Sequence, residues 1–342
     1  MANDDLLLDP SIDTDNEEFD CHLGKIPKEH LAVFQRLAKT NGKVNRMKKN
    51  QLIVNMKKKE LSTEGELDML RKRLKNYYKR KALVKAKICD AESNYFAYFV
   101  IIDIEATCTK DNPQDYKFEI IEFPAVLVDA KNQTIIDHFQ AYVKPTINPK
   151  LSEFCTELTG ITQSQIDSAD PFPICLKRFK EWLKKHELGT KHTFSVVTDG
   201  SFDMGRFLYG QCIMSGIPYP AFATKWINIR KVFKAYYFPK NVKNSVPCNI
   251  NAMLAFLGMR FEGSPHSGLD DSRNISRICI RLLEDGAFLD QNERIISLKN
   301  PTPFGKGDPL PIRPVHNIFC DGIHKKTQHW TQMKNLSLND KK

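Results

Sequence analysis

Hydrophobic and polar positions change their period several times along this chain, and each change predicts where an element begins or ends. Residues 95–104, 119–128 and 134–143 are rich in β-branched and aromatic side chains, which favours three strands. Short polar links join these strands, as in an antiparallel meander. Apolar runs at 193–198 and 225–230 predict two further strands that alternate with helical patterns. This order predicts an α/β fold with a mixed sheet flanked by helices.

The helical pattern at residues 269–283 carries an acidic residue on its apolar face. Ile275 belongs to the apolar stripe, and Asp271 lies four residues before it on the same face, whereas Asp270 faces the opposite side. A carboxylate that points at a protein core is costly unless it is paired or bound to a metal. Asp271 is therefore a candidate metal ligand, and His266 in the loop upstream is a candidate general base. Alternatively, Asp271 is an acid in the first turn that only stabilises the helix dipole, and His266 is an ordinary surface residue.

Asp103 and Glu105 form the clearest acidic pair. Side chains two apart on a strand share a face, so both carboxylates lie together at the end of the first predicted strand. They repel each other and resist desolvation, and a hard divalent cation such as Mg²⁺ removes both problems. A solvated strand end with two unrelated acids is the alternative. Asp203 lies at the expected start of a helix after the strand at 193–198, and the residues alone leave open whether Asp203 or Asp199 belongs to the same site.

The positive charge of the chain is concentrated in one segment. The net charge is +10, and residues 39–88 contain 17 Lys or Arg and four acids, whereas the first twenty residues contain eight acids and no Lys or Arg. Two short helices joined by a turn are expected here, and Lys72, Arg73, Lys79 and Arg80 lie opposite the apolar stripe of the second helix. Such a module favours a nucleic acid as its partner. The alternative is a charged linker helix.

The remaining segments carry weaker signals. Residues 1–38 are expected to be largely disordered, with one candidate helix near 28–37. Nine cysteines, an odd number without a Cys-x-x-Cys pair, favour reduced thiols. The absence of a signal peptide or membrane-length apolar run favours a cytoplasmic and nuclear or nucleolar protein with no membrane partner. Irregular spacing in the Pro/Gly-rich tail favours a flexible segment over a zinc site at His316, Cys320, His324 and His329.

The acids and the histidine together resemble the DEDDh signature of 3′–5′ exonucleases, written here as Asp103-x-Glu105, Asp203 and His266-x4-Asp271. Ile-Ile-Glu-Phe-Pro at 120–124, Leu-Thr-Gly-Ile-Thr at 158–162 and Lys-Trp-Ile-Asn-Ile-Arg at 225–230 are similar to segments of the enhancer-of-RNAi, or histone-mRNA 3′-end, exoribonucleases. This resemblance implies an RNase H-like fold, and the basic segment resembles a SAP domain. The expected divisions are an acidic, largely disordered segment (1–38), a SAP-like nucleic-acid-binding module (39–84), a DEDDh exonuclease domain (95–292) and a flexible tail (293–342).

The resemblance also implies roles for individual residues. Two Mg²⁺ ions, which Mn²⁺ can replace, would be held by Asp103, Glu105, Asp203 and Asp271, with Asp103 bridging both. His266 would deprotonate the attacking water, so that 5′-mononucleotides leave from a 3′ end. Residues implied to bind the terminal nucleotide are Glu105, Ala106, Phe154, Phe202 and His266, where Phe202 replaces a tryptophan of the relatives. Residues implied to contact the RNA backbone are Arg46, Arg73 and Lys79.

The implied substrate is a structured RNA with a 3′ overhang, such as a histone-mRNA stem-loop, the 3′ end of ribosomal RNA or a small interfering RNA. RNA-binding or ribosomal proteins are candidate partners. One alternative is a 3′–5′ DNA exonuclease, because SAP-like modules often bind DNA. The other is a non-catalytic RNA-binding scaffold, which should have lost a metal ligand or the histidine, whereas all five candidates are present.

Overall fold

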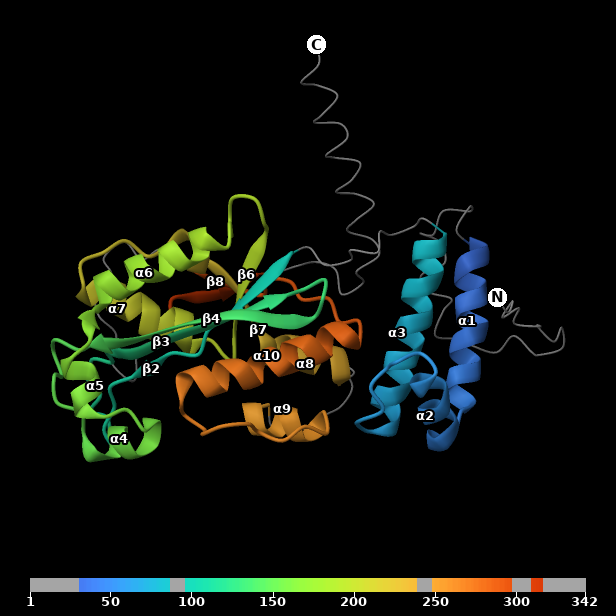
Figure 1. Ribbon diagram of the computed structural model, residues 1–342, viewed down its shortest axis with the longest axis horizontal. Coiled ribbons are helices and arrows are strands. Elements are labelled where there is room, and N and C mark those ends of the chain that lie inside the picture. Colours follow the sequence, from blue (N-terminus) through green and yellow to red (C-terminus); the bar gives the residue numbers. More distant parts are fainter. Residues whose placement is uncertain (1–30, 87–95, 239–247, 297–308, 316–342) are drawn as a thin grey trace, which may run out of the picture.

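The computed structural model describes residues 31–86, 96–238, 248–296 and 309–315. Within these residues a nine-stranded sheet has the order β5-β4-β3-β1-β6-β7-β8-β9, and β2 pairs with β3 outside this path. Helices cover both faces of the sheet, and the three N-terminal helices form a bundle at one end of the molecule (Figure 1).

The elements are as follows. The strands are β1 (Tyr98–Ile101), β2 (Glu105–Ala106), β3 (Ile120–Asp129), β4 (Thr134–Lys144), β5 (Asp170–Pro171), β6 (Phe194–Thr198), β7 (Lys225–Asn228), β8 (Glu293–Ile295) and β9 (Ile312–Pro314). The helices are α1 (Leu31–Arg46), α2 (Lys49–Lys57), α3 (Leu67–Lys85), α4 (Glu153–Thr159), α5 (Gln163–Asp167), α6 (Phe172–Lys185), the π-helix η3 (Asp203–Leu208), α7 (Tyr209–Met214), the 3-10 helix η4 (Ala221–Ala223), α8 (Ile229–Tyr237), α9 (Ile250–Phe256) and α10 (Gly268–Glu284).

The strand pairing confirms the expected meander and mixed sheet. β3 pairs antiparallel with both β1 and β4, while β6 is parallel to both β1 and β7. The strand predicted at 225–230 was two residues too long. Asn228 ends β7, and its side chain accepts a hydrogen bond from Lys231 N at 3.4 Å, which caps α8.

Side chains of the central strand β1 alternate between two hydrophobic cores. Phe99 and Ile101 face the layer of α8, α9 and α10, while Val100 and Ile102, just after the strand, face the layer of α6 and α7. All four are fully buried. Helices cover both faces of the central strands, so residues on both faces are apolar and the strands appear in the sequence as continuous apolar runs.

Helices α1, α2 and α3 bury a small core of their own, which confirms the apolar stripe expected on the second basic helix. Its members are all fully buried: Val44, Leu52, Met56, Leu70 and Leu74. Phe34 and Leu37 of α1 pack with Leu83 of α3. The boundary expected between residues 38 and 39 therefore falls inside α1, because its first two turns are needed to cover α3.

A second face of α3 is packed against the sheet-bearing part. Arg73 is 1% exposed, and its guanidinium donates to both carboxylate oxygens of Asp285, which directly follows α10. It also donates to the carbonyls of Ser62 and Glu64, at 2.6 and 2.9 Å. The expectation that Arg73 reaches RNA phosphates is therefore wrong for this conformation, because its charge is paired inside the protein. Lys72 is half-buried, with its ammonium 3.8 Å from the ring centre of Tyr236.

The sheet continues past residue 292, where a flexible tail was expected to begin. Glu293 of β8 is buried and accepts hydrogen bonds from Trp226 Nε1 at 2.9 Å and Asn228 Nδ2 at 3.2 Å, so this segment belongs to the domain. The four residues considered for zinc lie outside the described residues. Of the helices described, none is long and apolar enough to cross a membrane.

Candidate active site

The acidic pair lies where the chain passes from β1 to β2. Asp103 and Glu105 are partly buried, whereas Ile102 and Ile104 are buried in the core on the opposite face. The expectation that these two carboxylates share one face is confirmed.

Asp203 is brought to this pair by the chain after β6. It begins η3, and π-helical turns of this kind are frequent at functional sites. Its Oδ1 accepts a hydrogen bond from Ile104 N at 2.8 Å, and the residue is 6% exposed. The competing Asp199 is also buried, but Arg230 donates to it from Nε at 3.1 Å and from a second nitrogen. Asp203 therefore lies against the segment that carries Asp103, while Asp199 is paired with a cation.

Asp271 lies in the first turn of α10 and is 5% exposed, as the helical stripe predicted. Its Oδ2 accepts a hydrogen bond from His266 N at 2.7 Å. His266 is exposed and has a φ of 64°, a left-handed conformation that costs energy for a residue other than glycine. Potential ligand atoms of Glu105, His266 and Asp271 all lie within 4.8 Å of one another. The strained loop therefore holds the imidazole beside the acids.

A buried glutamate on β3 fixes the start of α10. Glu122 accepts hydrogen bonds from Gly268 N at 3.0 Å and from Gln140 Nε2 at 2.7 Å. A Cβ on Gly268 would lie 2.7 Å from the carbonyl oxygen of Asp103, so only glycine allows α10 to approach the acids this closely. The sequence reasoning missed Glu122. The available signal was one glutamate inside an otherwise apolar strand.

Burial raises the pKa of all four acids, and the charges of neighbouring carboxylates add to each shift. Burial, followed by the charges of Asp203 and Glu105, raises the pKa of Asp103 well above its usual range. Burial and the charge of Asp271 do the same to the pKa of Glu105. Burial also raises the pKa of Asp203 to about 7 and that of Asp271 to about 6, although backbone donors oppose both shifts.

The donor set fits a divalent cation. Four carboxylates supply hard oxygen ligands, and a doubly charged ion offsets both their burial and their repulsion. Glu105 and Asp271 belong to the group whose potential ligand atoms lie within 4.8 Å of one another, and the carboxylates of Asp103 and Asp203 lie close to that group. The cluster can therefore hold metal and act on an anionic substrate.

Two aromatic residues are candidates to contact a terminal base, and one of them, Phe202, directly precedes Asp203 in the chain. Phe202 is 53% exposed, so it is not a core residue, and the guanidinium of Arg206 lies 5.2 Å from its ring centre. Phe154 of α4 is half-buried. The neighbouring Cys155 Sγ lies 3.8 Å from the carbonyl oxygen of Ala106, so α4 packs directly against β2.

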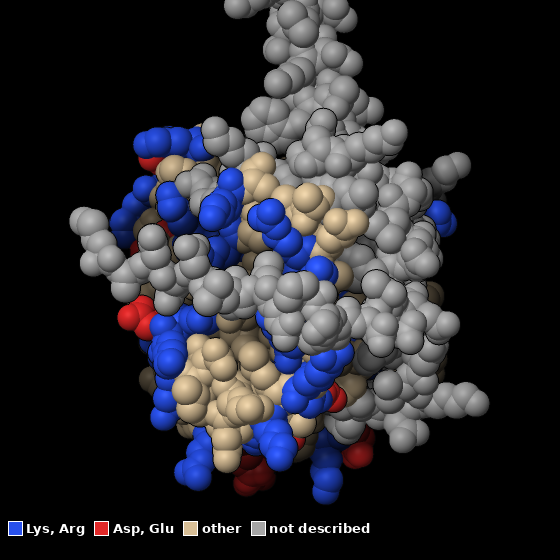
Figure 2. Space-filling model, turned by 90° about the vertical axis from the view of Figure 1, so that its right-hand side faces the viewer, with Lys and Arg blue, Asp and Glu red and all other residues tan. Residues whose placement is uncertain are grey.

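The N-terminal bundle presents a basic surface. Figure 2 shows Lys and Arg side chains spread over this end of the molecule with few acids between them. Arg46 and Lys79 are both exposed, unlike Arg73. The exposed basic residues of the bundle are Arg36, Lys39, Lys43, Arg46, Lys48, Lys49, Lys57, Lys58, Lys79, Arg80, Lys81 and Lys85.

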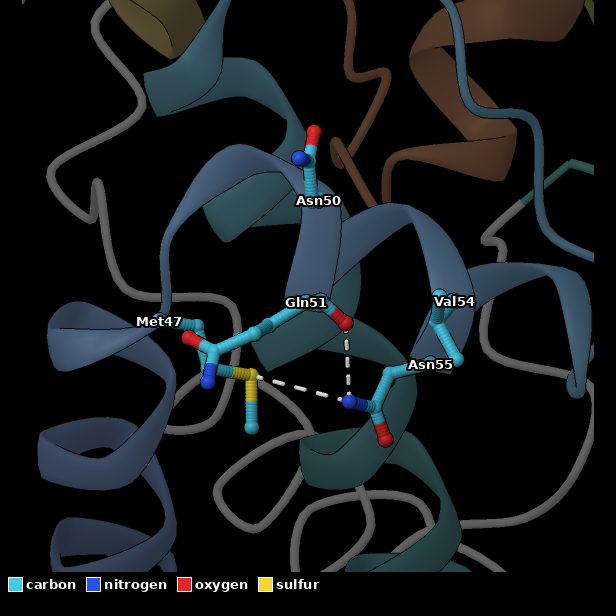
Figure 3. Close-up of a pocket in the computed structure, with 5 residues that line it drawn as sticks. All are labelled: Met47, Asn50, Gln51, Val54 and Asn55. Carbon is cyan, nitrogen blue, oxygen red and sulfur yellow. Dashed lines mark hydrogen bonds between the residues drawn. The ribbon is translucent and has the colours of Figure 1, made fainter.

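A hollow of about 340 Å³ lies beside α2 in the same bundle (Figure 3). It is lined by Met47, Asn50, Gln51, Val54 and Asn55, and the Asn55 amide donates to Gln51 O at 2.9 Å. None of these side chains is an acid or a base. The hollow therefore offers no catalytic chemistry, which is confined to the acidic cluster among the described residues.

Known proteins share both the sequence and the fold of this chain. Residues 100–279 match the RNase_T exonuclease family. The chain is 47% identical over 287 residues to 3′-5′ exoribonuclease 1 of Rattus norvegicus, covering 82% of this chain and 81% of the relative. The Homo sapiens protein of the same name is also 47% identical, with 82% and 80% covered.

Two solved structures are similar to the chain over most of their own length. A structure described as 3′-end specific recognition of histone mRNA stem-loop by 3′-exonuclease is 45% identical, with a TM-score of 0.58 and coverage of 66% of this chain and 93% of that one. The nuclease domain of 3′hExo, a DEDDh family member bound to rAMP, is 50% identical, with a TM-score of 0.56 and coverage of 59% and 98%.

Proposed function

Since this chain belongs to the RNase_T exonuclease family and is a 3′–5′ exoribonuclease with the RNase H-like DEDDh fold, we propose a substrate for it. The enzyme trims the 3′ end of a structured RNA that its basic helical bundle holds. The observation that carries the proposal is the convergence of four carboxylates and one exposed histidine from separate segments of the chain. As its family implies, the enzyme depends on a divalent metal.

We assign the metal as two Mg²⁺ ions. Asp103, Glu105, Asp203 and Asp271 would hold them. Mg²⁺ prefers carboxylate oxygens and phosphate, and Mn²⁺ accepts the same ligands. When bound, the ions polarise the scissile phosphate and stabilise the charge on the leaving oxygen.

His266 acts as the general base in this proposal. Its ring lies beside Glu105 and Asp271 and is exposed to solvent, so it can meet an incoming water and later release the proton to bulk solvent. Histidine is the side chain best suited to exchange protons near neutral pH. The water oxygen ends on the phosphate of the released 5′-mononucleotide, and the shortened RNA keeps a 3′-hydroxyl.

The terminal base is held by aromatic stacking. The exposed ring of Phe202 precedes Asp203, and Phe154 lies on the helix that packs against β2. A base stacked on an aromatic ring contributes about 1–3 kcal/mol to binding. In this proposal Glu105, Ala106 and His266 contact the same nucleotide, and the site takes a single unpaired strand.

The substrate we propose is an RNA stem with a short 3′ single strand. The basic bundle lies beyond the C-terminal end of α10, whereas Asp271 lies at its N-terminal end (Figure 1). Exposed Lys and Arg residues such as Arg46 and Lys79 bind phosphates without reading sequence. The recognition of a histone mRNA stem-loop by one similar exonuclease supports this choice.

A labelled RNA stem-loop with a 3′ overhang tests the mechanism. Stepwise shortening from the 3′ end, with release of 5′-mononucleotides, is expected only when Mg²⁺ is present. Asp103→Asn should lower the rate on the order of 10³-fold, because several kcal/mol of charge stabilisation are lost. Glu181→Gln, which changes an exposed acid on α6, is the matched control and should retain the wild-type rate. Full activity in Asp103→Asn would contradict the mechanism.

A deoxyribonucleotide version of the same stem-loop distinguishes the alternatives. Faster cleavage of RNA is expected. Faster cleavage of DNA would favour a DNA exonuclease, and tight RNA binding without any cleavage would favour a scaffold.

A further inference from the structure

Two cysteine residues contact each other next to the acidic cluster. Cys108 follows β2 and is partly exposed, whereas Cys155 of α4 is fully buried. Cys108 packs against the small cluster of buried residues that contains Cys155, and hydrogen bonding from Cys108 acts on the Cys155 thiol. The Cys155 sulfur also lies 3.8 Å from the carbonyl oxygen of Ala106. The buried sulfur therefore lies directly against residues 106–108.

One serine holds the two backbones together. Ser152 Oγ donates to the carbonyl of Cys108 at 2.6 Å and accepts from Cys155 N at 3.0 Å. A disulfide requires Cβ atoms about 3.8 Å apart and tolerates little backbone movement. Ser152 ties both backbones to one hydroxyl and the two cysteines pack in one cluster, so a local backbone shift can bring their sulfurs within bonding distance.

We propose that Cys108 and Cys155 form a reversible dithiol–disulfide site whose oxidation lowers the nuclease activity. This inference rests on the proposed function, because it concerns regulation of the same active site. β2 carries Glu105 and Ala106, and α4 carries Phe154. A disulfide would therefore tie the metal-binding strand to the helix that stacks the terminal base, and this bond would shift both from their catalytic positions.

The oxidant in this proposal is hydrogen peroxide. The reachable Cys108 sulfur attacks one peroxide oxygen, the O–O bond breaks, and the thiol proton leaves with the other oxygen as water. The Cys155 sulfur then attacks the sulfenic acid at Cys108, an S–S bond forms, the S–O bond breaks, and a second water leaves with the Cys155 proton. Two thiols lose two electrons, and one peroxide is reduced to two waters. The hydrogen bond between the two thiols and burial raise the pKa of Cys108, which slows the first step, whereas the same hydrogen bond lowers the pKa of Cys155 to about 7, which favours the second step.

Another buried cysteine provides a matched control. Cys175 of α6 is fully buried, and its thiol contacts the carbonyl oxygens of Tyr142 and Asp170, both at 3.5 Å. Like Cys155 it is a fully buried thiol on a helix, but its contacts are backbone carbonyls rather than a second thiol, and burial raises its pKa to about 11.

The experiment treats the reduced full-length protein with hydrogen peroxide, blocks free thiols, and maps peptides by mass spectrometry without reduction. The Cys108 peptide should be joined to the Cys155 peptide, and dithiothreitol should separate them. Cleavage of a single-stranded RNA should fall roughly tenfold to a hundredfold as the linked peptide forms, because small displacements of catalytic groups have effects of this size. Cys108→Ala should retain its activity after peroxide, whereas Cys175→Ala should lose it as the wild type does.

Three results would overturn the inference. They are a linked peptide with unchanged cleavage, a disulfide between other cysteines, and oxidation of Cys108 alone that dithiothreitol does not reverse. Failure of the proposed function would look different, because the reduced protein would then release no nucleotides before any peroxide is added.

Discussion

Replacing Asp285 with alanine should release the N-terminal bundle from the nuclease domain. Asp285 is fully buried, and besides Arg73 its carboxylate accepts from the Tyr237 hydroxyl at 2.5 Å. Without this carboxylate the Arg73 guanidinium remains buried with only the carbonyls of Ser62 and Glu64 as acceptors. Removing one partner of a buried ion pair costs about 3–5 kcal/mol, a factor on the order of 10²–10⁴ in the equilibrium.

Urea denaturation followed by circular dichroism measures this effect. With a slope of about 2–3 kcal/mol per molar urea, the midpoint of the Asp285→Ala variant should fall by roughly 1–2 M. Asp68→Asn is the matched control, because it removes the exposed pair of Asp68 with Arg71 on the same helix, 3.2 Å apart, and should leave the midpoint nearly unchanged. Replacing Arg73 and Asp285 together by Met and Leu should restore most of the loss. A midpoint shift for Asp285→Ala no larger than that of the control would refute the reasoning.

The other predictions concern the active site and the basic bundle. Without metal, the free energy of unfolding should fall as the pH rises from about 4 to about 7. The raised pKa values of Asp203 and Asp271 let the folded state keep protons that the unfolded chain has lost. A melting temperature that does not fall over this range, or that falls equally in Mg²⁺, would contradict the prediction. Glu122→Ala should lower kcat by roughly 10- to 100-fold with little change in KM, because the start of α10 loses its side-chain acceptor. An unchanged kcat in steady-state assays would exclude a positioning role for Glu122. Phe202→Ala should raise KM for RNA roughly 5- to 100-fold, and Phe202→Trp should not, which the same assays can measure. Lys79→Ala should reduce the slope of log binding constant against log salt concentration by about one for the stem-loop, as measured by fluorescence anisotropy. An unchanged slope would exclude a phosphate contact of Lys79.

The pattern of the sequence predicted the parts of the site that depend on local periodicity. Asp103 and Glu105 share a face because the chain between β1 and β2 keeps the alternation of a strand, although β1 itself ends at Ile101, and Asp271 faces inward because it continues a helical stripe. Asp203 could not be chosen over Asp199 from the residues alone. That choice depends on Arg230, whose guanidinium reaches Asp199 from beyond the next strand.

Arg73 shows why contacts between distant segments were not predicted. On α3, the stripe that includes Leu70 and Leu74 was recognised, and the opposite side was interpreted as solvated. The helix in fact has a second buried face, which includes Met69 and Arg73. This face packs against the C-terminal ends of α8 and α10. The partner Asp285 lies 212 positions away, and no local pattern of charges indicates it.

Helix α10 connects the two working parts of the enzyme. Its 17 residues span roughly 26 Å at 1.5 Å per residue. Asp271 lies in its first turn, while Arg281 in its last turn donates to Ser62 Oγ at 2.6 Å, next to the Arg73 pair. If the basic bundle holds an RNA stem as we propose, α10 sets the distance between that stem and the point of cleavage. The length of 3′ strand left on a trimmed stem is then set by the dimensions of the protein, whatever the sequence of the RNA.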